Sequence, residues 1–342
     1  MIRANVCHWG KSEWLAIAKS LFSSKKSAIQ SRQELTKLLE DTYQSQTVLM
    51  NSARAAIQIG LEYAGAKNSE KNEVLIPEYI CSSVPDIIHQ AGCVVVSVPV
   101  DSFLNIDSTV LEEFITGNTR AVIAPHMYSR PADIVKIARI CRERKVFLID
   151  DAAQVAGISV ESKPLGTYGD MGVLSFAQAK TIVTGVQASG GVLITQDEAI
   201  NQYVEHKVKP LTPAVARWSN LLHFLLSYYW QGPFKLLDYY RHRILSKIRR
   251  NVPDSFYTRC EISSVEARIA LCQFDSLERR QQQTAKTLNV YRELLSELKT
   301  VKCPQLTEDI NYLSRLILQS TKLSPEAVID FFAKQGVQAK KA

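Results

Sequence analysis

Short apolar runs alternate with helical patterns from about residue 50 to residue 200. Amphipathic spacing predicts helices over 53–64 and 132–144. Runs that are apolar at every position are typical of parallel strands buried on both faces, and their alternation with helices predicts an α/β sheet covered on both sides. The predicted strands are 74–76, 94–98, 121–124, 146–149, 172–176 and 192–194.

The remaining chain shows other patterns. The spacing of Ile262, Val265 and Ile269 predicts one long amphipathic helix over about 262–298. The pattern therefore divides the chain into an N-terminal helical segment (1–50), a large α/β domain (51–207), an aromatic and basic helical insertion (208–255), and a long helix with a small α+β domain (256–342).

The insertion at 208–255 combines many aromatic residues with a basic cluster: Arg241, Arg243, Lys247, Arg249 and Arg250. No run in it reaches the roughly 18 apolar residues that a membrane-spanning helix needs. Two interpretations stay open. The segment is either a helical hairpin packed on the body or on a second subunit, or a peripheral membrane contact through residues 218–250.

The composition is that of an ordinary globular protein, with 46% hydrophobic and 22% charged residues. The seven cysteines are scattered and contain no CxxC pair, which argues against a disulfide framework and against a metal site. No secretory signal is evident, so we expect a cytoplasmic protein. The basic cluster accounts for much of the net charge of +7. No nucleic-acid-binding motif accompanies it, so we expect no nucleic acid partner.

A predicted apolar strand ends in Asp150 and Asp151, followed by two alanines and Gln154. A carboxylate near the core needs a cationic partner, because an unpaired buried charge is costly. A protonated pyridine nitrogen is such a partner, and Asp151 would keep that ring able to accept the electrons of a carbanion. An acidic turn or helix cap is the alternative.

Two further polar segments follow strand-like runs. Ser175 and Lys180 come after 172–176, where the serine would bind phosphate and a desolvated lysine would lose its proton and form an imine. Ser52 precedes the helix predicted at 53–64, and the free backbone N–H groups at the start of that helix would bind a phosphate. A solvated lysine and an ordinary serine cap are the alternatives.

These segments occur in the order found in the DegT/DnrJ/EryC1/StrS family of pyridoxal-phosphate (PLP) dependent nucleotide-sugar aminotransferases, which the chain resembles. Asp150–Gln154 resembles the family's acid-Asp-Ala-Ala-Gln segment. Leu174–Phe176 with Lys180 resembles its Phe-Ser-Phe strand and lysine. Pro125–Asp133 resembles its His-x-Tyr-Gly-x-Pro-Ala-Asp segment, and Gly190-Gly191 its glycine pair.

The resemblance implies PLP-dependent transferase fold type I, with a mostly parallel seven-stranded sheet between helices and a smaller C-terminal α+β domain that looks shortened. It implies PLP as cofactor. The resemblance implies that Lys180 forms the imine and acts as general base. It implies that Asp151 pairs with the pyridine nitrogen and that Gln154 contacts the phenolic oxygen of the ring. The residues implied to bind the phosphate are Ser52, Ala53, Arg54 and Ser175.

Some positions depart from the family pattern. Arg54 stands in place of a threonine hydroxyl. Cys81 stands where many members stack an aromatic on the ring, which leaves a thiol contact or Tyr79 in that role. Arg259 precedes the helix at 262. It is a candidate for a contact that family members make to the phosphate bound in the partner subunit.

The implied reaction moves an amino group from an amino acid, usually glutamate, to a nucleotide-linked keto-sugar. It would serve surface polysaccharide, lipopolysaccharide or secondary-metabolite synthesis, and the enzyme would be a homodimer. A sugar 3-dehydratase would carry histidine in place of Lys180, and a cysteine desulfurase would need an activated cysteine. The alternative from another class is a non-catalytic protein of this fold with a regulatory or assembly role.

Overall fold

The computed structural model describes residues 9–22, 24–185, 189–209, 259–297, 300–304, 306–308, 310–320 and 322–335. The predicted insertion lies outside these residues, apart from its first two positions.

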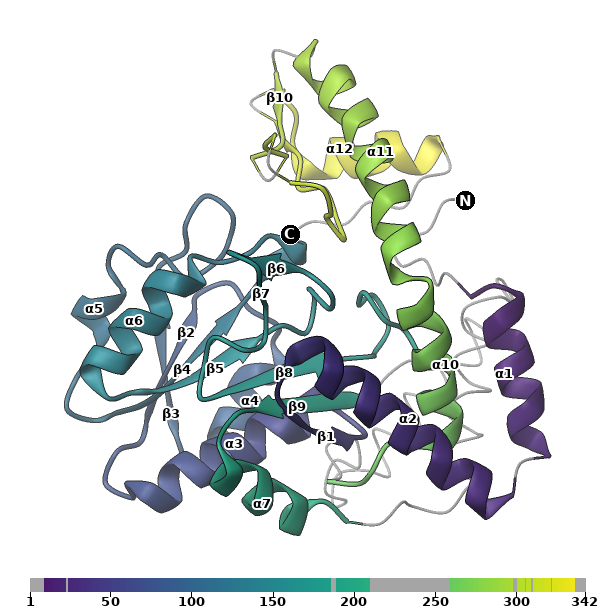
Figure 1. Ribbon diagram of the computed structural model, residues 1–342. Helices are drawn as coiled ribbons and strands as arrows, with labels where there is room; N and C mark the ends of the chain where they lie inside the picture. Colours follow the sequence, from purple (N-terminus) through teal and green to yellow (C-terminus); the bar gives the residue numbers. More distant parts are fainter. Residues whose placement is uncertain are drawn as a thin grey trace, which may run out of the picture.

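A seven-stranded sheet forms the centre of the described structure, in the order β1-β9-β8-β5-β4-β2-β3 (Figure 1). Strand β9 is antiparallel to both of its neighbours, and the other pairs are parallel. The predicted mostly parallel α/β fold is confirmed. The strands are β1 (Gln46–Met50), β2 (Glu73–Pro77), β3 (Val94–Val98), β4 (Thr119–Pro125), β5 (Phe147–Asp151), β8 (Met171–Ser175) and β9 (Gly191–Thr195).

Helices cover both faces of this sheet, as the continuously apolar strands predicted. Leu148 packs in the hydrophobic cluster on one face, and Ile149 packs in the cluster on the other. The Ile149 face is covered by α3 (Ala53–Lys67), α4 (Ser83–Gln90) and α7 (Glu198–Lys207). The Leu148 face is covered by α2 (Lys25–Tyr43), α5 (Leu111–Phe114), α6 (Ile134–Arg144) and α10 (Ser264–Asp275).

Strand β1 lies inside the segment that the hydrophobic pattern assigned to N-terminal helices. It pairs antiparallel with β9, and Met50 lies opposite Gly191. The partner strand is more than 140 residues away along the chain, so local spacing carries no sign of the pairing. As a result, Ser52 is delivered to the end of the sheet, where it forms a bridge with Gly190.

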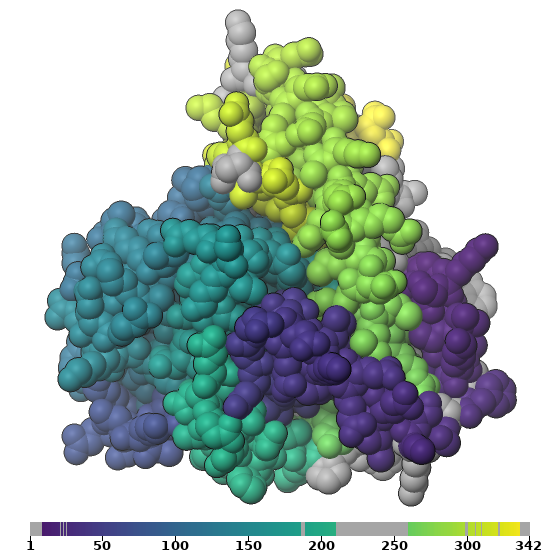
Figure 2. All heavy atoms as spheres, viewed as in Figure 1, coloured from purple at the N-terminus to yellow at the C-terminus, as the bar shows by residue number. Residues whose placement is uncertain are grey.

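The N-terminal helices pack on α10, as Figure 2 shows for α1 (Lys11–Leu21) and α2. The Arg268 guanidinium, on α10, donates to the hydroxyls of Ser20 at 2.9 Å and of Ser27 at 2.7 Å. The Trp9 indole donates to the Val183 carbonyl at 2.7 Å. The Arg268 bonds attach the N-terminal segment to α10, and the Trp9 bond attaches it to the loop that follows β8.

The predicted continuous helix over 262–298 is instead two helices, α10 and α11 (Leu277–Ser296), that meet at Ser276. The carbonyl of Gln273 accepts hydrogen bonds from the Ser276 hydroxyl at 3.2 Å and from Arg280 at 2.8 Å. Side chains therefore satisfy the end of α10, which periodicity does not reveal.

Helix α11 leads away from the sheet to the small C-terminal unit (Figure 1). That unit contains the paired strands β10 (Val301–Lys302) and β11 (Gln319–Ser320), and α12 (Pro325–Lys334). Ser324 caps α12 and Pro325 occupies its first turn. A further short pair, β6 (Ser159–Val160) and β7 (Lys163–Pro164), precedes β8. Among the described residues, no helix is long and apolar enough to cross a bilayer.

Gly172→Ala is expected to lower the free energy of unfolding by about 2–3 kcal/mol. A Cβ at Gly172 would lie 1.9 Å from the carbonyl oxygen of Gly166, so the loop before β8 would have to move. Urea unfolding measures the change. Gly117→Ala is the matched control, because a Cβ there meets no atom within 4 Å. Equal stability of the two variants would contradict this account of the packing.

Candidate active site

The predicted site residues converge at one end of the sheet. Asp151 ends β5, Ser175 ends β8, and Ser52 lies between β1 and α3. Ser175 pairs with Gly191, and Ser52 bridges Gly190, so the two serines lie on either side of the start of β9. This is the edge where open α/β sheets bind ligands.

Asp151 presents a buried carboxylate to this site. Burial raises the pKa of its carboxyl, while Lys180 and the hydrogen bond from the Ala153 N–H, at 3.1 Å, oppose the rise. Among the described residues, no cation lies within 4 Å of this carboxylate. The arrangement suits a cationic group held against Asp151.

Lys180 returns toward Asp151 from the loop after β8. Ala179 has a left-handed backbone, with φ of 66°, which turns the chain, and the Lys180 N–H donates to the Ala177 carbonyl at 3.3 Å. Burial lowers the pKa of the Lys180 ammonium most strongly, and Arg315 and Arg54 lower it further, against opposing effects of Asp151 and Cys81. A lowered pKa supplies the neutral amine that imine formation requires.

The N-terminus of α3 and two serines form a site suited to phosphate. The Ser52 hydroxyl accepts from the N–H groups of Arg54 at 3.2 Å and Ala55 at 3.4 Å, so Ser52 is also the predicted helix cap. A Cβ on Gly191 would lie 2.3 Å from the Ala53 nitrogen. Glycine is therefore required for the helix end, with its positive dipole, to lie on the sheet beside Ser175.

Gln154 is held by a turn, η1 (Met127–Ser129), at the end of β4. The Tyr128 N–H donates to the Gln154 side-chain oxygen at 3.2 Å, and the Ser129 hydroxyl donates to the Gln154 carbonyl at 2.5 Å. Tyr128 and Ser129 both have positive φ values, 53° and 71°. Ser129 occupies the position of the glycine in the resembling motif, and its hydroxyl adds a bond that glycine lacks.

Tyr79 and Cys81 follow the end of β2, at the same edge of the sheet as the other predicted site residues. The hydroxyls of Tyr79 and Tyr128 lie 2.5 Å apart, and burial together with this bond raises the pKa of Tyr79 to about 12. Cys81 is exposed, and its sulfur lies 3.2 Å from the Ser83 hydroxyl. It nevertheless acts on Lys180, whose pKa it raises. Both residues therefore remain candidates for the ring contact.

Arg315 is a site residue that the sequence did not indicate. It comes from the small C-terminal unit, and its guanidinium carbon lies 5.7 Å from the centre of the Tyr128 ring. The Ser314 N–H donates to the Tyr128 carbonyl at 3.1 Å and holds this segment on η1. Arg315 also lowers the pKa values of Lys180 and Tyr79. Neither spacing nor motif links a residue of this unit to Lys180.

Arg259 has a different partner from the one that the resemblance suggested. Its guanidinium forms a two-pronged ion pair with the Glu62 carboxylate on α3, one bond of which measures 2.8 Å. In this chain it fastens the segment before α10 to the large domain.

A cavity of about 430 Å³ lies away from this site, at the opposite edge of the sheet. Its basic lining includes Lys67 at the end of α3 and Arg142 and Lys145 at the end of α6. Cations at helix C-termini are stabilised by the helix dipoles. The charges therefore have a structural explanation there.

The chain belongs to the DegT/DnrJ/EryC1/StrS aminotransferase family, whose model matches residues 22–341. It is therefore a member of a PLP-dependent aminotransferase family. GDP-perosamine synthase from Escherichia coli O157:H7 is 28% identical over 165 residues, 48% of this chain and 44% of the relative. L-glutamine:2-deoxy-scyllo-inosose aminotransferase from Micromonospora echinospora is 32% identical over 159 residues, 46% of this chain and 36% of that protein. The matched regions thus span less than half of these relatives.

Solved structures share the fold across almost the whole chain. Helicobacter pylori PseC, an aminotransferase involved in the biosynthesis of pseudoaminic acid, superposes with a TM-score of 0.72 over 97% of this chain and 81% of its own, at 15% identity. Escherichia coli GDP-4-keto-6-deoxy-D-mannose-3-dehydratase with bound hydrated PLP gives a TM-score of 0.69 over 98% and 84%, at 16% identity.

The residues present fit PLP. The Asp151 carboxylate, which has no cation within 4 Å among the described residues, matches a protonated pyridine nitrogen. The N-terminus of α3 can lie close to a phosphate because Gly191 carries no side chain. Lys180 has the lowered pKa of an imine-forming lysine.

Asp151→Asn is expected to stabilise the cofactor-free protein at neutral pH while weakening PLP binding. The raised pKa means that the native carboxyl binds its proton more tightly than the unfolded one. The wild type therefore loses stability as pH rises above the ordinary value of 3.8, until the native pKa is passed.

Urea unfolding over a pH series measures this difference, with the exposed Asp41→Asn as control. A gain for Asp151→Asn that grows with pH and is absent from Asp41→Asn is the expected result. No gain at neutral pH would contradict the assigned burial cost.

Proposed function

We propose that the chain is an aminotransferase that moves an amino group from an amino acid, glutamate, to a nucleotide-linked keto-sugar. The observation that carries the proposal is the joint placement of Lys180, with its lowered pKa, and the buried Asp151 at the carboxyl edge of the sheet. The names of the relatives, which include a GDP-perosamine synthase, support a sugar as acceptor.

When bound, PLP supplies an electron sink for the carbanion formed at the substrate carbon. In the proposed reaction, the Asp151 carboxylate keeps the pyridine nitrogen protonated. The freed Lys180 amine takes a proton from the donor carbon and returns one to the acceptor. Ser52, Ser175 and Arg54 hold the phosphate and thereby fix the ring relative to Lys180.

Lysine at position 180 favours amino transfer over the dehydratase reaction, because the related sugar 3-dehydratases carry histidine at this position. A non-catalytic role is the second candidate. Two departures favour it: Arg54 at the phosphate turn, and the exposed Cys81 in place of a stacking aromatic. We further propose a homodimer in the cytoplasm that serves surface polysaccharide or secondary-metabolite synthesis.

Arg315 is proposed to hold a negative group of the substrate. It lies at the boundary between the small C-terminal unit and the large domain, beside Tyr128 and within electrostatic range of Lys180. A guanidinium binds a carboxylate through two parallel hydrogen bonds. The amino-acid donor carries such a carboxylate beside its amino group, which would react next to Lys180.

Lys180→Ala is expected to abolish the visible absorption band that PLP gives when joined to the protein. The wild type is expected to show the band and to lose it on addition of L-glutamate, as nitrogen is transferred to the cofactor. Lys286→Ala, an exposed lysine on α11, is the matched control and should behave like the wild type. A wild type without the band would favour the non-catalytic candidate.

Arg315→Gln is expected to raise the KM for glutamate by about 10–100-fold, since a hydrogen bond to a charged group contributes about 1.5–3 kcal/mol. The KM for the sugar nucleotide should change less. Steady-state kinetics measures both constants, and the exposed Arg279→Gln on α11 serves as control. An unchanged KM for glutamate would remove Arg315 from the donor site.

A further inference from the structure

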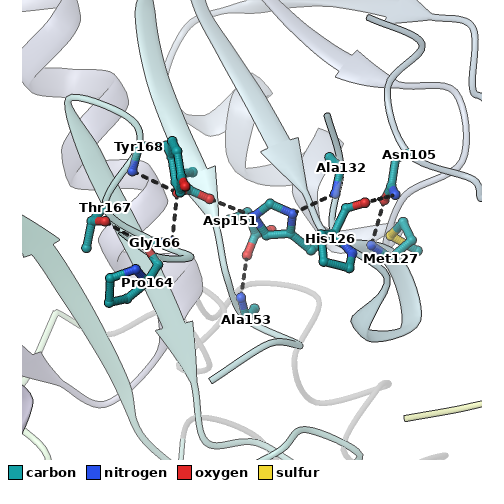
Figure 3. Close-up of polar contacts among 12 residues, drawn as sticks. Asn105, His126, Met127, Ala132, Asp151, Ala153, Pro164, Gly166, Thr167 and Tyr168 are labelled. Atoms are coloured by element: carbon teal, nitrogen blue, oxygen red, sulfur yellow. Dashed lines mark hydrogen bonds and ion pairs between the residues drawn. The ribbon is translucent and has the colours of Figure 1, made fainter. Parts of the chain in front are cut away.

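A fully buried pair, Asp150 and His126, lies next to residues of the site. Figure 3 shows His126 of this pair with its bond from Ala132. The His126 Nε2 and an Asp150 carboxylate oxygen are 2.8 Å apart, and both side chains have 0% exposure. The other carboxylate oxygen accepts from the N–H groups of Gly166 at 2.7 Å and Tyr168 at 3.0 Å. Three donors therefore surround this carboxylate, which compensates its burial.

The protonation of His126 follows from its two partners. The Ala132 N–H donates to Nδ1 at 3.0 Å, so Nδ1 carries no proton and Nε2 carries the proton donated to Asp150. The bond that one ring nitrogen makes fixes the state of the other. The geometry therefore assigns the Nε2–H tautomer to His126, with Asp150 as the acceptor.

The side chain of Asp150 lies on the opposite face of β5 from that of Asp151. Successive side chains of a strand alternate between faces. Asp150 shares its face with Leu148, while Asp151 shares its face with Ile149. Asp150 is fully buried and cannot touch a ligand at the site, so any effect of the pair on catalysis is exerted through its neighbours.

The pair connects three segments that carry site residues. His126 directly precedes η1, whose Tyr128 and Ser129 hold Gln154. Asp150 precedes Asp151 on β5 and binds the loop at 166–168 that leads into β8. The turn has two residues at positive φ, a costly conformation that persists only where its surroundings determine it.

We infer that Asp150 and His126 are positioning residues that hold Asp151 and Gln154 at a fixed spacing across the PLP ring. The inference rests on the proposed function. The bond between the pair joins the turn carrying Gln154's partners to the strand end that carries Asp151. Breaking it frees the turn to relax and misplaces both contacts to the cofactor without removing either.

The test compares two substitutions of His126. In His126→Gln, the amide nitrogen can reach the position of Nε2 and donate to Asp150. In His126→Asn, the amide oxygen can take the place of Nδ1 and accept from Ala132, but no donor reaches Asp150. The PLP dissociation constant, the visible band and the separate kcat and KM values are measured for each, with thermal unfolding alongside.

His126→Asn is expected to weaken PLP binding at least about tenfold and to lower kcat by about 100-fold, because small misplacements at a reacting centre have effects of that size. His126→Gln should retain PLP affinity within about threefold. A purely structural role would instead lower the thermal midpoint of both variants and leave PLP affinity and kcat intact. That result would overturn the inference.

Nitrogen NMR of the cofactor-free wild type gives a test that needs no variant to fold. The expected spectrum, at mildly alkaline pH, has a proton on His126 Nε2 and none on Nδ1. A proton on Nδ1 would overturn the inference. This result does not depend on PLP, so it separates failure of the positioning pair from failure of the proposed function, which a wild type without the visible band would indicate.

Discussion

The burial of the Asp151 carboxylate at the end of β5 is the constraint on which the site depends. Burial disfavours its charge, and among the described residues the nearest compensation is the Ala153 N–H and the field of Lys180. The same low-polarity surroundings disfavour the Lys180 ammonium. One environment therefore disfavours the charged form of both groups, which suits the cationic ring and the imine that we propose for this site.

The rest of the fold brings backbone segments close to Asp151 and Lys180. Strand β1 pairs with β9 and brings the N-terminus of α3 onto the glycines at the start of β9. The Trp9 and Gln273 side chains bind the Val183 carbonyl and N–H, both at the loop that follows Lys180. Segments remote in sequence thus restrict the loop that carries the lysine.

The turn at the end of β4 shows how one substitution is accommodated. Ser129 replaces a glycine of the family motif and adopts a left-handed conformation that serine rarely takes. Its hydroxyl bonds to the Gln154 carbonyl, and the Asn105 side chain accepts from the Met127 N–H at 2.8 Å. Neighbouring polar contacts therefore compensate the backbone strain and keep the turn in place over the site.

The sequence by itself determined the fold class and the main chemical groups, because continuous apolar strands and the segments around Asp151 and Lys180 are local features. Tertiary structure decided what depends on distant pairing. It placed β1 in the sheet, paired Arg259 with Glu62 and brought Arg315 to the site. Such contacts join residues far apart in the chain, and no local periodicity encodes their distance.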